Sequence, residues 1–90
     1  MIEPAQIRAA RALLGWRQED LSKASRVGSA TVRRIESSNR SATSYVSTIS
    51  RIQAAFEKAG VLFIDDDGSA GFGVRLAKTK KKQKRTTKPA

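Results

Sequence analysis

The 90-residue chain contains no cysteine and no histidine. Without cysteine it cannot form disulfide bonds or carry out thiol chemistry, and without histidine it also lacks the commonest general base and a usual ligand of zinc. No stretch approaches the roughly 20 apolar residues that a membrane span requires, and the first residues lack the basic charge and apolar run of a signal peptide. We therefore expect a cytoplasmic protein that is not an enzyme and holds no metal or cofactor.

Acidic residues are also scarce. The chain has 8 Asp and Glu against 18 Lys and Arg, which gives a net charge of +10. Such a charge attracts polyanions such as nucleic acids. Residues 78–90 contain no acidic residue and no apolar residue that could anchor a fold, so we expect a disordered tail. Its uniform sign favours non-specific DNA contact over a merely solubilising role. The basic residues of the tail are Lys78, Lys80, Lys81, Lys82, Lys84, Arg85 and Lys88.

Residues 18–36 have the pattern of two short helices joined by a tight turn. The apolar residues of this segment can bring the inward faces of both helices into one core, and they are Leu21, Ala24, Val27, Val32 and Ile35. Thr31, Arg33 and Arg34 remain outside, beside Ser29 and Ala30 at the start of the second helix. This is the layout of a helix-turn-helix, which places the first residues of its second helix in the major groove of DNA.

Two further helices flank this segment. Pro4 suits the first turn of a helix that runs to about Leu14 and ends at Gly15; its apolar face is expected to hold Ile7, Ala10, Leu13 and Leu14. Trp16, just before the second helix, is expected to pack in the core. A fourth helix, from about Ser44 to Ala59, carries apolar residues three and four positions apart and ends at Gly60: Tyr45, Val46, Ile49, Ile52, Phe56 and Ala59.

After Gly60 the pattern changes to that of a β-hairpin, with strands at residues 61–64 and 72–76. The acidic run of residues 65–67 lacks the alternating ligands and distal glutamate of a calcium loop, so we interpret it as a solvated turn. A two-stranded hairpin is marginally stable alone. It must lie on the helices or pair with a second chain, and we expect a homodimer interface there, formed by Phe63, Ile64, Phe72, Val74 and Leu76. The rival is a dimer through the fourth helix, with the hairpin folded back on its own subunit.

Two stretches within residues 4–59 resemble the phage-repressor-like (Xre/Cro) family of bacterial and phage transcription factors. They are Ala-Arg-Ala-Leu-Leu-Gly-Trp-Arg-Gln-Glu-Asp-Leu, residues 10–21, and Ala-Thr-Val-Arg-Arg-Ile-Glu, residues 30–36. The resemblance implies a mainly α protein: a four-helix repressor-like domain with a helix-turn-helix (residues 1–60), a β-hairpin (61–77) and a disordered basic tail (78–90).

The resemblance also implies roles for individual residues. Gln18 corresponds to a glutamine that contacts a phosphate and supports the recognition helix, and Arg11 and Glu36 match a structural ion pair of the family. The positions that face bases or lie beside them are Ser29, Ala30, Arg33 and Arg34. Contacts to the DNA backbone are expected from Arg17, Gln18, Arg26, Thr31, Asn39, Arg40, Thr43 and Ser44. Ser29 is also compatible with a phosphate or water contact, and Thr43 and Ser44 with capping of the fourth helix.

The chain departs from the family pattern at three places. Arg26 stands where the family usually has Gly in the turn, and Arg17 and Gly28 replace the usual Ser or Thr helix caps. If the turn keeps its left-handed backbone, a non-Gly residue there costs roughly 1 to 2 kcal/mol. Either Arg17 and Arg26 offset this loss with phosphate contacts, or the changes are drift in a protein stabilised by dimerisation.

Two functional hypotheses follow. The first is a sequence-specific regulator, by default a repressor or autoregulator, that binds an inverted-repeat operator as a homodimer in the bacterial nucleoid. The second is a protein-interaction module, such as an antitoxin or antiactivator, that binds a partner protein through the hairpin. The basic, hydroxyl-rich outer face of the third helix favours the regulator, because a purely protein-binding descendant would have no need of it.

Overall fold

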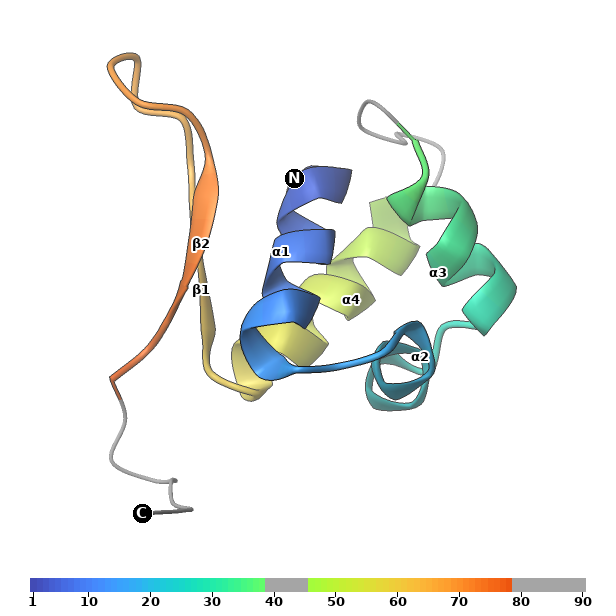
Figure 1. The fold of residues 1–90 in the computed structure, drawn as a ribbon. Helices are drawn as coiled ribbons and strands as arrows, with labels where there is room; N and C mark the ends of the chain where they lie inside the picture. Colours follow the sequence, from blue (N-terminus) through green and yellow to red (C-terminus); the bar gives the residue numbers. More distant parts are fainter. Residues whose placement is uncertain (39–45, 79–90) are drawn as a thin grey trace.

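The computed structural model describes residues 1–38 and 46–78 (Figure 1). Four helices, α1 (Pro4–Leu14), α2 (Gln18–Ser25), α3 (Ser29–Glu36) and α4 (Val46–Lys58), precede the strands β1 (Val61–Ile64) and β2 (Gly73–Leu76). The predicted order of four helices and a hairpin is therefore confirmed. The expected start of the fourth helix at Ser44 and the expected disorder of the tail lie outside the described residues, apart from Lys78.

Local sequence signals account for the bounds of α1. Pro4 occupies its first turn, where a missing backbone N–H costs nothing. Just before it, Glu3 donates its backbone N–H to Oε1 of Gln6 over 2.7 Å. Gly15 ends the helix in the left-handed conformation, with φ of 68°, which glycine adopts without the steric penalty of a side chain. These short-range signals are the reason that the predicted bounds of α1 are correct.

The hydrophobic core lies where the four helices meet the inner face of the hairpin. Its largest fully buried side chains come from every helix and from β1. Trp16 packs against this core, and its ring stacks on Phe56 at 5.6 Å between ring centroids, so the predicted core position of Trp16 is confirmed. The fully buried side chains are Ile7, Leu21, Val32, Ile35, Ile49, Ile52, Phe56 and Val61.

Some of the predicted core positions are wrong. Ala24 is exposed, and the neighbouring Ser25 is buried instead. Residues three and four positions after Leu21 flank it on opposite sides of the helix axis, by about 60° and 40°, and packing against α3 and α4 selects the second side. Ser25 tolerates burial because its Oγ donates to the Leu21 carbonyl over 2.7 Å. Leu13 is 42% exposed, since it lies about 100° around the axis from the half-buried Leu14.

The expected apolar face of the fourth helix is also too long. Val46 and Ala59 are exposed, whereas Ile49, Ile52 and Phe56 between them are buried. Ala59 follows the last residue of α4, where fewer neighbouring elements cover a side chain, and Val46 is the first residue of α4 that the structure describes. Tyr45 lies outside the described residues.

The hairpin lies on the helices of its own subunit. β1 and β2 pair antiparallel with Phe63 opposite Val74, β2 contacts α1 and β1 contacts α4. On the inner face Val61 is buried, and Phe63 and Val74 pack against the core while half-exposed. The ring of Phe63 meets that of Phe56 edge-on at 6.0 Å. β2 begins one residue later than predicted, so Phe72 belongs to the loop.

A buried amide attaches the end of the hairpin to α1. Nε2 of Gln6 donates to the carbonyl oxygens of Ile64 and Gly73, over 3.2 and 3.0 Å. The side chain of Gln6 is 3% exposed. Ile64 and Gly73 face each other across the two strands; the side chain of Ile64 points to the outer face, and Gly73 has no side chain. The inner side therefore exposes backbone carbonyls, and Gln6 satisfies them.

The hairpin loop uses its own carboxylates as backbone acceptors. The Asp66 carboxylate accepts the N–H of Gly68, and Asp67 accepts the N–H groups of Ser69 and Ala70. The bond from Ala70, followed by those from Ser69, lowers the pKa of Asp67. Within the described part of the chain, no three potential metal ligands come together. This geometry is that of a turn stabilised by aspartates.

No helix of the described residues is long and apolar enough to span a membrane.

Candidate nucleic-acid interface

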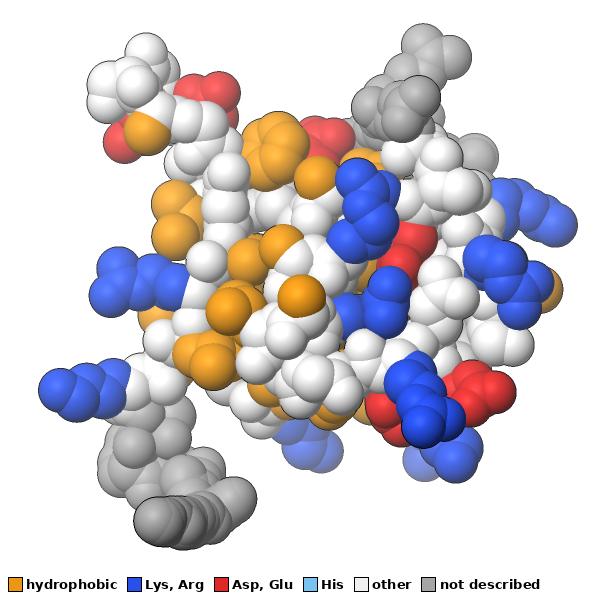
Figure 2. Space-filling view, viewed as in Figure 1, with side chains coloured by type: hydrophobic (Ala, Val, Ile, Leu, Met, Phe, Trp, Pro, Cys, Tyr) orange, Lys and Arg blue, Asp and Glu red, His pale blue; other side chains and the backbone are white. Residues whose placement is uncertain are grey.

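The helix α3 presents a polar, basic outer surface. Val32 and Ile35 point into the core, whereas Ala30, Arg33 and Arg34 are exposed and Ser29 and Thr31 are partly exposed. Figure 1 shows α3 on the side of the helical layer opposite the hairpin. In Figure 2, many Lys and Arg side chains lie over the side that carries α2 and α3, and hydrophobic side chains gather over α1 and the hairpin. In this view, the side with α2 and α3 is the more basic one, and the side with α1 and the hairpin is the more apolar one, although Arg75 is exposed there. We call them the basic side and the apolar side.

The turn between α2 and α3 keeps the left-handed backbone despite its arginine. Arg26 has φ of 61° and is the one non-glycine residue with positive φ among the described residues. Its N–H donates to the Ser22 carbonyl, as does that of Val27 over 3.3 Å, and the Ser22 hydroxyl donates back to the Val27 carbonyl. The packing of the two helices thus imposes a conformation that glycine would adopt more readily.

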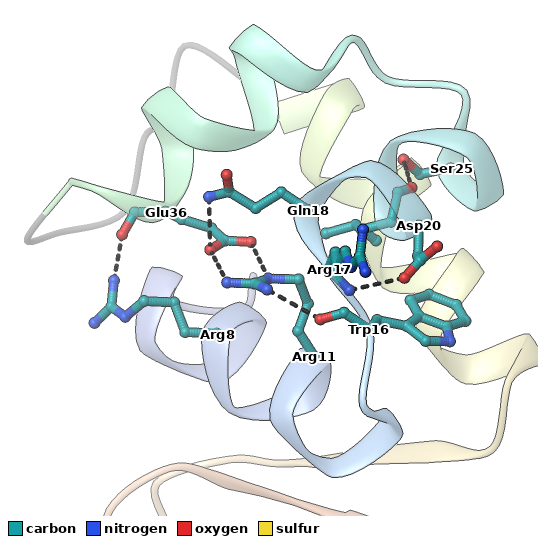
Figure 3. Close-up of polar contacts among 9 residues, drawn as sticks. Arg8, Arg11, Trp16, Arg17, Gln18, Asp20, Ser25 and Glu36 are labelled. Carbon is teal, nitrogen blue, oxygen red and sulfur yellow. Dashed lines mark hydrogen bonds and ion pairs between the residues drawn. The ribbon is translucent and has the colours of Figure 1, made fainter.

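An ion pair ties the end of α3 to α1 (Figure 3). Nε and Nη2 of Arg11 donate to the two carboxylate oxygens of Glu36 over 2.7 and 2.8 Å. Glu36 is 4% exposed. Nη1 of Arg11 reaches the Trp16 carbonyl over 3.0 Å, and Arg8 donates to the Glu36 carbonyl. Four donors from α1 therefore hold the C-terminal end of α3 and the start of the loop before α2.

The helix α2 joins this network through its first residue. Nε2 of Gln18 donates to Oε1 of Glu36 over 3.2 Å, so one carboxylate links α1, α2 and α3 (Figure 3). Arg17 lies just before α2, and its backbone N–H donates to the Asp20 carboxylate over 2.8 Å. Asp20 also suits the positive end of the α2 dipole. This arrangement leaves the exposed side chain of Arg17 outside the helix cap.

The structure brings together the predicted DNA-contacting residues of α2, the turn and α3. Those from α2, the turn and α3 lie within residues 17–34, whereas Asn39, Arg40, Thr43 and Ser44 lie outside the described residues, as does the tail after Lys78. Sequence reasoning missed Arg8 and Arg51. Nη2 of Arg51, on α4, donates to the Arg26 carbonyl. No local signal could reveal this contact, because it joins residues 25 positions apart.

The predicted dimer residues divide between the two sides of the hairpin. Phe63 and Val74 face the helices of their own subunit, and Ile64, 41% exposed, lies on the outer face. Leu76 is opposite the buried Val61, on the inner side, but is 45% exposed at the end of β2, and Phe72, in the loop, is 47% exposed. Leu62, which the prediction omitted, is 48% exposed on the outer face beside Ile64. Its cross-strand neighbour on that face is Arg75, also exposed. The outer face of the hairpin is therefore apolar with one basic residue.

A helix-turn-helix family model matches residues 7–56, which is more than half of the chain. No curated protein and no solved structure gives a significant match. The matched residues begin in α1 and end in α4, so they include the turn, α3 and the network around Glu36, and they leave the hairpin outside. The chain belongs to the phage-repressor-like (Xre/Cro) helix-turn-helix family of DNA-binding transcriptional regulators.

Proposed function

We propose that the protein is a sequence-specific regulator, by default a repressor or autoregulator, that binds an inverted-repeat operator as a homodimer. The observation that carries this proposal is the outer face of α3, where Ala30, Arg33 and Arg34 are exposed beside Ser29 and Thr31. A recognition helix of a helix-turn-helix enters the major groove with such a face. Nothing in this role requires a catalytic residue.

The side chains of α3 suit different contacts in the groove. Arg34 has the two parallel donors that match O6 and N7 of guanine, and a methyl group such as that of Ala30 fits the methyl group of thymine. Arg33 reaches a base or the adjacent backbone. We assign Ser29 to a base or a bridging water and Thr31 to a phosphate. These residues would read sequence only if α3 keeps its orientation.

The network around Glu36 supplies that orientation. Arg11, Gln18 and Arg8 attach the end of α3 to two other helices, so binding does not have to order the helix first. Pre-organised groups bind more tightly because less conformational freedom is lost on association. We also propose phosphate contacts for Arg17 and Gln18, at the start of α2. The same role is proposed from the family pattern for Asn39, Arg40, Thr43 and Ser44.

Replacement of Arg34 tests the base-reading role. We expect Arg34→Ala to lower affinity for the operator by roughly 1 to 3 kcal/mol, with a much smaller loss on random DNA, because a bidentate contact to a base is lost. The operator is first defined by footprinting the protein on the DNA upstream of its own gene, and both duplexes are then titrated by fluorescence anisotropy. Arg75→Ala, on the hairpin, is the matched control. An equal loss on both duplexes would show that Arg34 touches only phosphate.

The place of the hairpin constrains how a homodimer can bind one duplex. The hairpin and α3 lie on opposite sides of α1 and α4 (Figure 1). A two-fold dimer that packs the two outer faces together would direct the two α3 helices away from each other. Pairing of two strand edges places both helical layers on the same side of a four-stranded sheet, so both α3 helices can face one duplex at the spacing of about 34 Å between half-sites. We therefore propose edge pairing.

The apolar outer face of the hairpin favours a second candidate function. Leu62 and Ile64 are about half-exposed there, and exposed apolar patches are typical of protein-binding surfaces. In this alternative, the chain is an antitoxin-like or antiactivator-like module that binds a partner protein through the hairpin. A chain that binds no DNA sequence in preference to another would support this alternative over the regulator.

A further inference from the structure

The turn between α2 and α3 combines backbone strain with an accumulation of positive charge. Arg26 is held in the left-handed conformation, which raises the free energy of a residue with a side chain. The guanidinium of Arg51 lies at the carbonyl of the same residue. Arg51 therefore contacts the backbone of a residue that itself carries a positive side chain, and both side chains are exposed.

Neither arginine is paired with a carboxylate in the part of the chain that the structure describes, residues 1–38 and 46–78. Lys23, one turn earlier in α2, adds a third exposed positive charge. Part of this charge suits the negative end of the α2 dipole, but Arg51 belongs to α4 and ends at the carbonyl of the turn. These exposed positive charges therefore favour the binding of an anion from outside the chain.

The position of this charge specifies the anion. Arg26 lies three residues before Ser29, where α3 begins, so a duplex that receives α3 in its major groove brings its sugar-phosphate backbone close to the turn. We propose that Arg26 and Arg51 together bind one backbone phosphate of DNA at the edge of that groove. This inference rests on the proposed DNA-binding function and adds Arg51, a residue of α4, to the interface.

The contact explains why the turn retains an arginine. Glycine would remove the backbone strain of Arg26 but also its charge. Arg51 has two roles in this arrangement: one guanidinium nitrogen holds the carbonyl of the turn, and the remaining N–H groups are available to a phosphate oxygen. A guanidinium carries five N–H donors in a planar fork, so it can serve both partners at once.

The test uses the full chain and a generic duplex of about 30 base pairs, because a phosphate contact acts on every sequence. The affinities of the wild type, Arg26→Gly, Arg51→Gln and the double variant are measured by fluorescence anisotropy between about 0.1 and 0.5 M salt. Loss of one phosphate contact flattens the slope of log affinity against log salt by about 0.9. The factor by which affinity falls is therefore roughly eight times larger at about 0.1 M salt than at about 1 M salt. Arg75→Gln, on the far side of the molecule, controls for the loss of one charge.

We expect the slope of each single variant to be flatter than that of the wild type by most of this 0.9. The double variant should be little flatter than either single variant, because both arginines bind the same phosphate. Arg51→Lys should restore the slope, since it restores the charge. Thermal unfolding of each variant separates binding from stability. If Arg26→Gly and Arg51→Gln are folded and have the same slope as a wild type that binds DNA, the inference is wrong. The proposed function would still stand. A double variant that loses twice the slope of either single variant would overturn the shared phosphate, and a wild type without salt-dependent binding would overturn both proposals.

Discussion

Ser25 and Arg26, at the end of α2, differ in how well each residue fits its conformation. Ser25 is buried, and its hydroxyl is satisfied by the Leu21 carbonyl of its own helix. Arg26 follows it in the left-handed conformation, which a β-carbon disfavours. One residue therefore fits its place by hydrogen bonding, and the other occupies its place only because α2, α3 and Arg51 impose the conformation of the turn.

At the scale of this residue, we expect Arg26→Gly to stabilise the fold. The reason is relief of the left-handed strain, worth roughly 1 kcal/mol, although the greater freedom of glycine in the unfolded chain offsets part of it. A gain of about 1 kcal/mol raises the melting temperature of a domain of this size by about 4 to 8 °C. Differential scanning calorimetry at fixed salt measures it, with Arg26→Ala as the control that removes the charge and keeps the strain. A lower melting temperature for Arg26→Gly than for Arg26→Ala would contradict this account.

Among the elements, the hairpin depends most on its neighbours. A two-stranded hairpin is marginally stable alone, and here Val61, Phe63 and Val74 supply the apolar contacts with the helices. Gln6 adds the polar contact at the far end of the strands, near the loop. The hairpin is therefore a part of the helical domain, although the match to the family covers only the helices.

Replacement of Gln6 tests how the hairpin is attached. Gln6→Met keeps a side chain of similar length but leaves the buried amide contacts unmade, so we expect a loss of about 1 to 3 kcal/mol in the free energy of unfolding. Hydrogen exchange should rise mainly in β1 and β2, because the helices keep their own core. Gln53→Met, on the surface of α4, is the control for loss of an exposed amide. If exchange rises equally in α3, Gln6 stabilises the whole domain and not the hairpin in particular.

At the scale of the whole molecule, the basic side with α3 and the apolar side with the hairpin face in different directions. Edge pairing of hairpins uses backbone groups that are free in one subunit. Ala77 donates its N–H to the Gly60 carbonyl over 2.7 Å, and hydrogen-bonded and non-hydrogen-bonded pairs alternate along an antiparallel ladder. Phe63 and Val74 are therefore a non-hydrogen-bonded pair, and the N–H of Val74 points to the outer edge of β2.

This geometry makes Val74→Pro a selective test of the dimer. Proline removes an N–H that the hairpin itself does not use, and edge strands tolerate it; we therefore expect a folded monomer with much weaker operator binding. Val74→Ala keeps the N–H and should remain a dimer. Phe72→Asp should also weaken the dimer, by placing a charge at the apolar end of β2. Sedimentation at micromolar concentration measures all three.

A variant of the outer face separates the possible interfaces. Ile64→Ser removes an apolar side chain from the outer face without touching the edge, so a dimer through strand edges should survive it. If Val74→Pro stays dimeric and Ile64→Ser becomes monomeric, the outer faces form the interface. If both stay dimeric, the interface lies elsewhere, as in a dimer through α4.

We propose that residues 78–90 contribute to DNA binding through their positive charge. We expect a chain without residues 78–90 to fold normally, because the last backbone bond of the hairpin is made by Ala77, and to bind every DNA sequence more weakly. Each lost phosphate contact should flatten the slope of log affinity against log salt by about 0.9. Circular dichroism checks the fold, and anisotropy titrations check the slope. A truncated chain with the full slope would show that the tail does not touch DNA.

Local signals in the sequence were sufficient to predict the helix-turn-helix within residues 18–36, the bounds of α1 and the presence of the hairpin. Those features depend on signals that act within one helical turn or one strand, such as Pro4, Gly15 and the spacing of apolar residues. The tertiary structure alone decided that Ser25 and not Ala24 is buried, that the hairpin lies on α1, and that Arg51 reaches the turn. Each of these depends on which elements pack together, and contacts between residues far apart in sequence exist only once the helices have found their common core.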